Sequence, residues 1–259
     1  MITGIINLTF GGAAAVMSPL FAYLLIEKGY VFTSNFCAVF SVLSGTSVAL
    51  FIKLPKNELY NEKRLSPTLS LRNIISLSSF WQLWGVWALA GAAGISLIVM
   101  ASSFGEYSGY SITQYVYILT CFNILNGIGR IVCGRLADTY SRQKILVIIF
   151  LMASISYVLM PWFYNLYIIC FMACFIGLSF GAMFTVSAPL VTEVFGLENF
   201  GKIFGLIFTA YGFFAGLLGP WLSSKILDIT DLNFKIVFSL FSIFYLVSAF
   251  LISRVRKDF

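Results

Sequence analysis

The sequence predicts an all-α integral membrane protein, a bundle of eight transmembrane helices. Hydrophobic residues make up 60% of the 259 residues and charged residues only 10%, and the mean hydropathy is +0.95. Soluble domains carry charge on about a quarter of their residues, so this composition excludes a soluble fold. The apolar runs are continuous instead of alternating, which indicates helices and not the strands of a barrel.

Each span of a bilayer core needs roughly 20 apolar residues. Eight windows meet this length, at 2–26, 31–52, 78–101, 112–133, 144–160, 165–189, 203–225 and 233–253. The gaps hold turn or charge signals, such as "EKGY" at 27–30 and "PWFYN" at 161–165. Residues 1–52 therefore contain two helices, 53–77 form a polar and basic linker, and 78–259 contain six helices.

The lysines and arginines predict the orientation of these helices. If both termini are cytoplasmic, twelve basic residues fall on the cytoplasmic side and three, Lys28, Lys225 and Lys235, on the outer side. This bias follows the positive-inside rule. We expect a multi-pass protein of the cell (inner) membrane with both termini in the cytoplasm. The net charge of +6 then reflects topology and anionic lipid, and no nucleic-acid partner is expected.

A shift of 201 residues aligns the first two predicted helices with the last two. It places Gly11 on Gly212 and Pro19 on Pro220. Repeats of this kind are common in membrane transporters. If the repeat has six helices, the helices from residue 78 onward form one complete half, and the first two are the end of an earlier half that is otherwise missing.

The residue types needed for a metal site or an enzyme are scarce. The sequence has no histidine, and its five cysteines show no paired spacing for a metal or redox site. Histidine is the commonest metal ligand and the usual proton shuttle. No nucleophile–base set or pair of intramembrane acids stands out either. We therefore expect no metal, no cofactor and no enzymatic activity.

One arginine, Arg130, ends the glycine-rich apolar run "NGIGR" at 126–130. A charged residue inside a span is costly and usually faces a cavity or a partner. The planar guanidinium matches a carboxylate bidentately, and Asn126 lies four residues earlier on the same helix face. In the alternative interpretation the side chain extends to the lipid headgroups at the nearby cytoplasmic end of its helix.

The stretch "GRLADTYSRQKIL" at 134–146 is similar to the cytoplasmic-loop signature of the major facilitator superfamily. The matching residues are Gly134, Leu136, Ala137, Asp138, Arg142 and Leu146, and the departures are Thr139, Ser141 and Gln143. The resemblance implies a gating motif of Gly134, Asp138 and Arg142, in which Asp138 accepts from helix N-terminal amides or pairs with a neighbouring arginine. Such contacts would break and reform as two halves of the bundle rock. Alternatively, the basic residues are only membrane anchors.

Within this superfamily the chain resembles the oxalate/formate antiporter branch, with the monocarboxylate porters as relatives. The residues that carry the resemblance are 80–100, 126–130 and 204–220, and it extends over the whole chain, aligned to helices five to twelve. It implies a secondary transporter that moves a small organic anion by alternating access. It also implies that Arg130 corresponds to the arginine of the eighth helix that binds the substrate carboxylate.

The same resemblance assigns three further substrate-binding residues. Asn126 stands where proton-coupled porters tend to have an aspartate, and because asparagine cannot carry a proton, exchange or facilitated transport is favoured. Tyr211 stands where the oxalate carrier has a lysine, so a single carboxylate is favoured over a dianion; its side chain either donates a hydrogen bond or packs as an aromatic wall. Phe184 falls near an aromatic residue that lines the cavity in relatives, or it packs against lipid.

Aromatic and glycine spacings add two structural expectations. Three tryptophans recur at helical spacing near the start of the third span, namely Trp81, Trp84 and Trp87. Interfacial anchoring is favoured for them over the alternative of stacking on the substrate. Two G-x-x-x-G pairs predict close helix packing, namely Gly177/Gly181 and Gly212/Gly216.

The expected partners are a small organic anion and the lipid bilayer. The passage of such a transporter lies between two halves, so a separate chain that supplies the missing N-terminal helices is a further expected partner if this chain is one piece of a split carrier. The competing hypothesis is a truncated membrane protein that does not transport.

Overall fold

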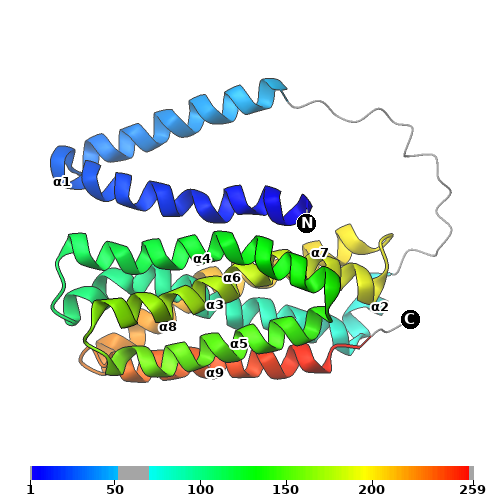
Figure 1. Ribbon diagram of the computed structural model, residues 1–259. Helices are drawn as coiled ribbons and strands as arrows, with labels where there is room; N and C mark the ends of the chain where they lie inside the picture. The colour runs from blue at the N-terminus through cyan, green and yellow to red at the C-terminus, as the bar shows by residue number, and fades with distance from the viewer. Residues whose placement is uncertain (1, 52–69, 257–259) are drawn as a thin grey trace.

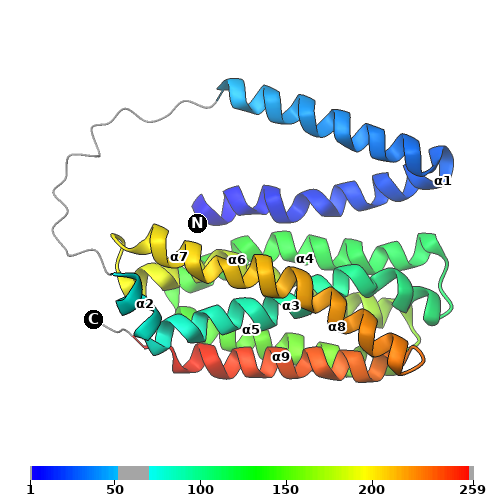
Figure 2. The same cartoon turned by 180° about the vertical axis from the view of Figure 1, so that it is seen from behind.

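The computed structural model describes residues 2–51 and 70–256, and all the regular secondary structure in these residues is helical (Figure 1). Seven helical runs in this part of the chain are long and apolar enough to cross a membrane. The first, α1 (Ile2–Phe51), folds back at Gly29 into two antiparallel arms (Figures 1 and 2). The predicted all-helical membrane fold with eight helices is therefore confirmed.

The reversal in α1 depends on the backbone conformation of one glycine. Gly29 has φ 77° and ψ 175°, a conformation that side chains with a Cβ rarely adopt. It falls in the "EKGY" segment that the sequence predicts as a turn. Substitution of this residue would therefore strain the turn between the first two spans.

The remaining helices are α2 (Leu71–Ser76), α3 (Ser78–Tyr107), α4 (Ile112–Thr139), α5 (Arg142–Leu159), α6 (Leu166–Phe195), α7 (Phe200–Thr209), α8 (Gly216–Ile229) and α9 (Phe234–Arg254). A short 3-10 turn, η2 (Met160–Trp162), follows α5. A π-helical segment, η3 (Ala210–Ala215), joins α7 to α8. Helix α7, η3 and α8 together form one continuous membrane helix, which corresponds to the predicted span at 203–225.

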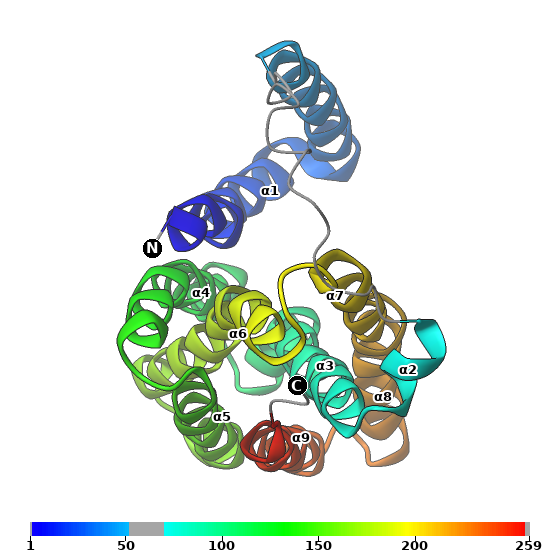
Figure 3. The ribbon, with the colours of Figure 1, turned by 90° about the vertical axis from the view of Figure 1, so that its right-hand side faces the viewer.

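The helices from α3 to α9 form one bundle, and α1 lies outside it against α4 (Figure 3). Helix α3 contacts α4, α8, α9 and η3, so it occupies the interior of the bundle. Helix α4 packs along α6, and α5 packs along α9. The start of α1 and the end of α9 lie at the same end of the bundle, as an even number of spans requires (Figure 1).

Glycines hold α4 and α6 in backbone contact. A Cβ on Gly177 would lie 2.0 Å from the carbonyl oxygen of Phe122, and one on Gly181 would lie 2.1 Å from that of Asn126. Both distances are far below van der Waals contact, so no other residue fits without separating the helices. The close packing predicted for this G-x-x-x-G pair is confirmed.

The prediction for the second pair, Gly212/Gly216, is wrong for the described residues. A Cβ on Gly212 would meet no atom within 4 Å, and one on Gly216 would meet only its own helix. The π-helical segment turns Gly212 to the exposed side. Gly219 makes the close contact instead, because its Cβ would lie 2.7 Å from the carbonyl oxygen of Ala92 on α3.

Three helices end later in the chain than the sequence predicts. Helices α3, α4 and α6 continue past the predicted ends at 101, 133 and 189, because a helix can keep its hydrogen bonds beyond the apolar stretch that a hydropathy window detects. Pro189 lies inside α6 without ending it, since neighbouring helices stabilise such a break. Of the predicted linker at 53–77, residues up to 69 lie outside the described part of the chain, and the end of the linker carries α2.

Candidate functional site

Arg130 lies on α4, deep inside the helix bundle, with 1% of its surface exposed. Its Nε donates a hydrogen bond of 3.4 Å to Oδ1 of Asn126, one turn earlier on the same helix. Its guanidinium carbon lies 4.8 Å from the ring centroid of Phe184 on α6, in cation–π geometry. The α4–α6 contact therefore buries the guanidinium between an amide and an aromatic face.

The side chain of Arg130 extends away from the nearer end of its helix. Helical side chains lean toward the N-terminus of their helix, and the contact with Asn126 follows that direction. A snorkelling arginine would instead reach the headgroups and remain exposed. The geometry thus differs from the one that the lipid-headgroup interpretation requires.

Tyr211 approaches the same place from η3. Its ring lies 5.2 Å from the ring of Phe184, and it is close enough to Arg130 for the two groups to interact electrostatically. π-helical segments occur frequently at functional sites. The structure therefore brings Arg130, Asn126, Phe184 and Tyr211 together from α4, α6 and η3. We call these four residues the arginine site.

Trp87 belongs to this region, and its predicted role as an interfacial anchor is wrong. Its side chain is fully buried, and its ring packs edge-to-face against Phe184 at 5.0 Å and Tyr211 at 5.8 Å. Trp81, in contrast, is 53% exposed. Helical spacing alone does not distinguish these tryptophans, because α3 lies inside the bundle beyond its first turn.

One signal in the sequence could have placed Trp87 inside. Gly91 lies one turn later on the same face of α3. A Cβ on Gly91 would lie 3.0 Å from Cβ of Ala215 and 3.3 Å from Cδ2 of Tyr211. A glycine one turn from a tryptophan thus marks the face where α3 meets η3.

Gly134 of the predicted gating motif lies in the α4–α6 contact and not in a turn. It is buried within α4, and its Cβ would lie 2.9 Å from Cγ2 of Thr185 on α6. The turn itself is short, because α4 ends at Thr139 and α5 begins at Arg142. Gly134 thus keeps α4 close to α6 one turn beyond Arg130.

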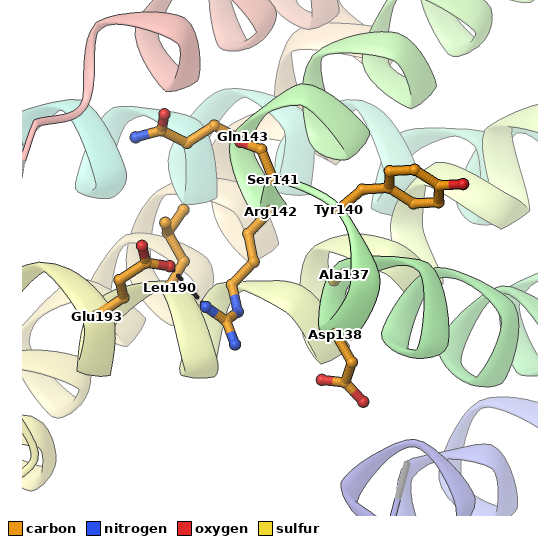
Figure 4. A pocket seen from close by; sticks show the side chains of 8 residues that line it. All are labelled: Ala137, Asp138, Tyr140, Ser141, Arg142, Gln143, Leu190 and Glu193. Atoms are coloured by element: carbon orange, nitrogen blue, oxygen red, sulfur yellow. Dashed lines mark hydrogen bonds and ion pairs between the residues drawn. The ribbon is translucent and has the colours of Figure 1, made fainter.

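Arg142 forms an ion pair with Glu193 in which Nη1 and Oε2 are 2.6 Å apart. The pair joins the start of α5 to the end of α6 and borders a cavity of about 220 Å³ (Figure 4). Asp138 lines the same cavity as this pair (Figure 4). The role of Asp138 in the gating motif stays a prediction, and Glu193 is a partner of Arg142 that the motif does not include.

We predict that the Arg142–Glu193 pair stabilises the protein modestly. Both side chains are about one-third exposed, at 29% and 36%, and exposed pairs contribute about 0–1 kcal/mol that salt screens. A double-mutant cycle of Arg142→Gln and Glu193→Gln, read from melting temperatures, should show coupling that fades in high salt. Glu198→Gln, at an exposed position in the turn after α6, is the matched control. Coupling that persists in high salt would contradict this account.

A charged side chain buried inside a bundle of membrane helices often marks a substrate pathway, which points to a transport protein. Comparison with known sequences gives the family, because the profile of the Major Facilitator Superfamily matches residues 1–220 and 92–258. The chain belongs to this superfamily. Since its members are transporters, the prediction that the chain is not an enzyme is confirmed.

One curated relative is the "Uncharacterized MFS-type transporter YhjX" of Escherichia coli (strain K12). It is 23% identical to this chain over 191 residues, which are 72% of this chain and 46% of the relative. The chain thus matches about half the length of this relative.

Proposed function

We propose that the chain is the substrate-binding part of a secondary transporter that moves a small organic anion by alternating access. The observation that carries the proposal is Arg130, a guanidinium almost completely buried in a membrane bundle. Such a residue is expensive to insert and in most cases functional. Its planar fork binds a carboxylate through two parallel hydrogen bonds, which are strong where water is excluded.

The substrate that suits the arginine site best is a monocarboxylate. Arg130 is the cation of the site, while Asn126, Phe184 and Tyr211 are neutral. A dianion would bring a second charge for which these four residues provide no counterion, and an uncompensated charge is costly in a low dielectric. Because Asn126 cannot carry a proton, we propose exchange or facilitated transport, as in the oxalate/formate antiporter branch that the sequence resembles.

The gating motif and the membrane orientation complete the proposal. We place both ends of the chain and the turn between α4 and α5 on the cytoplasmic side of the cell (inner) membrane, in line with the twelve basic residues counted there. Gly134, Asp138 and Arg142, together with Glu193, then lie at the cytoplasmic end of the bundle. Polar contacts there are the ones that alternating access would break and reform.

Transport and binding place different demands on the chain. The four residues of the arginine site come from α4, α6 and η3, which all belong to the bundle of α3 to α9, so we propose that this bundle binds anions by itself. We propose that transport additionally requires the helices of the other half of the fold. Uptake measured with and without a co-expressed four-helix segment of a relative would separate these two demands.

Thermal stability of the protein in lipid nanodiscs tests the proposed ligand class. A ligand that binds the folded state at 100 times its Kd adds about 2.7 kcal/mol of stability, so binding raises the melting temperature. Acetate and propionate should stabilise the protein, whereas acetamide, oxalate and malonate should not. Equal shifts with acetate and acetamide would contradict the proposal.

A further inference from the structure

The indole N–H of Trp87 is a buried donor without an acceptor among the residues that the structure describes. The side chain has no exposed surface, and its Nε1 makes no hydrogen bond there. The two preceding tryptophans of α3 differ in this respect. Trp81 donates to the carbonyl oxygen of Ile75 at 2.8 Å, and Trp84 donates to Oγ1 of Thr209 at 3.2 Å.

An unmatched donor of this kind requires a reason. Buried tryptophan N–H groups usually find a partner, and a buried polar atom that lacks one loses its hydration without compensation. Exceptions in native proteins are few, and each calls for a structural or functional explanation. A phenylalanine would fill the same aromatic position without this cost, so the N–H itself is the feature to explain.

Trp87 lies beside the arginine site. Its ring and the Arg130 guanidinium both contact the ring of Phe184, at 5.0 Å and 4.8 Å. Its ring also contacts Tyr211 at 5.8 Å, and Gly91 keeps α3 close to that residue. The unmatched donor thus belongs to the same aromatic cluster that holds the guanidinium.

We propose that Trp87 is a substrate-binding residue whose indole N–H donates a hydrogen bond to an uncharged oxygen of the organic anion held by Arg130. This inference rests on the function proposed above. The guanidinium fork uses both oxygens of a carboxylate. The Trp87 indole N–H is a single uncharged donor beside this fork. It suits an uncharged hydroxyl or carbonyl oxygen of the ligand, in addition to the two charged carboxylate oxygens. The preferred ligands are therefore carboxylates with such an oxygen near the carboxyl group.

Trp87→Phe tests this proposal because it retains an aromatic ring and removes the N–H. The affinities of glycolate and acetate, and of pyruvate and propionate, are measured by titration of the protein in nanodiscs. The variant should bind glycolate and pyruvate about tenfold more weakly, as expected for one lost hydrogen bond, and acetate and propionate within about twofold of the unchanged protein.

Trp84→Phe is the matched control, since it removes an indole N–H that already has the acceptor Thr209. It should leave the preference for glycolate over acetate unchanged. In the unchanged protein, the ¹H–¹⁵N signal of the Trp87 indole should shift with glycolate and stay in place with acetate. This second measurement does not depend on the folding of a variant.

Three outcomes overturn the inference. If Trp87→Phe lowers the affinity for all four acids equally, or for none of them, Trp87 does not bind the hydroxyl or carbonyl oxygen. The function proposed for Arg130 is unaffected by that result. An indole signal that responds to acetate as strongly as to glycolate has the same meaning. If the unchanged protein binds none of the acids, the proposed function and the role of Trp87 both fail.

Discussion

Replacement of Arg130 with glutamine should abolish the binding of small monocarboxylates. The variant loses the two hydrogen bonds of the guanidinium fork, and hydrogen bonds to charged groups contribute about 1.5–3 kcal/mol each. Affinity should therefore fall by about 100-fold or more. Arg130→Lys, which keeps the charge but not the fork, should retain a small part of the affinity. Titration in nanodiscs measures both effects.

The control for this prediction is Arg135→Gln on the same helix. Arg135 is exposed toward the end of α4, and its substitution changes the net charge of the protein by the same amount. It should leave the affinity within about twofold, which corresponds to well under 1 kcal/mol. The melting temperature of Arg130→Gln should not fall, because a buried charge has been removed. Equal losses of affinity in both variants would indicate a general effect of charge and contradict a direct contact.

Replacement of Gly181 with alanine should destabilise the bundle and weaken anion binding together. The new Cβ would lie 2.1 Å from the carbonyl oxygen of Asn126 and 2.9 Å from its carbonyl carbon. These are backbone atoms, so α4 and α6 must move apart. Overpacking of this kind costs about 1–3 kcal/mol, and occasionally more. Because Asn126 and Phe184 hold the guanidinium from these two helices, the arginine site should loosen as well.

Gly205→Ala is the control for the glycine substitution. Gly205 is helical and exposed on α7, and a Cβ there would meet no atom within 4 Å. The melting temperature and the affinity of this variant should stay close to those of the unchanged protein. If Gly181→Ala melts at the same temperature as Gly205→Ala, the helices are not in the close contact described here.

The sequence was sufficient to predict the fold, because hydropathy determines which segments enter the bilayer. The eight spans, the reversal near Gly29 and the contact at Gly177/Gly181 all follow from patterns that are local in the chain. The helix ends were less accurate, because hydrogen bonding continues after hydropathy falls. The π-helical segment that carries Tyr211 has no hydropathy signal and could not be predicted.

The candidate site was partly predictable for a similar reason. Arg130 stands out because a charge in an apolar run is rare, and Asn126 follows from helical spacing. The position of Trp87 depends on which face of α3 meets η3, and hydropathy does not distinguish those faces in a helix that is apolar all round. The partner of Arg142 was missed because Glu193 is remote in the sequence and joins it only through the packing of α5 on α6.

The central claim is that the Arg130 guanidinium binds a carboxylate inside the bundle. Solid-state NMR in lipid bilayers can measure the dipolar coupling between ¹⁵N of this guanidinium and the ¹³C-labelled carboxyl carbon of bound glycolate. Bidentate binding predicts a nitrogen–carbon distance of about 3.5 Å, since the hydrogen bonds themselves are about 2.7–2.9 Å long. A guanidinium that couples to lipid ³¹P and shows no coupling to the carboxylate would contradict the account.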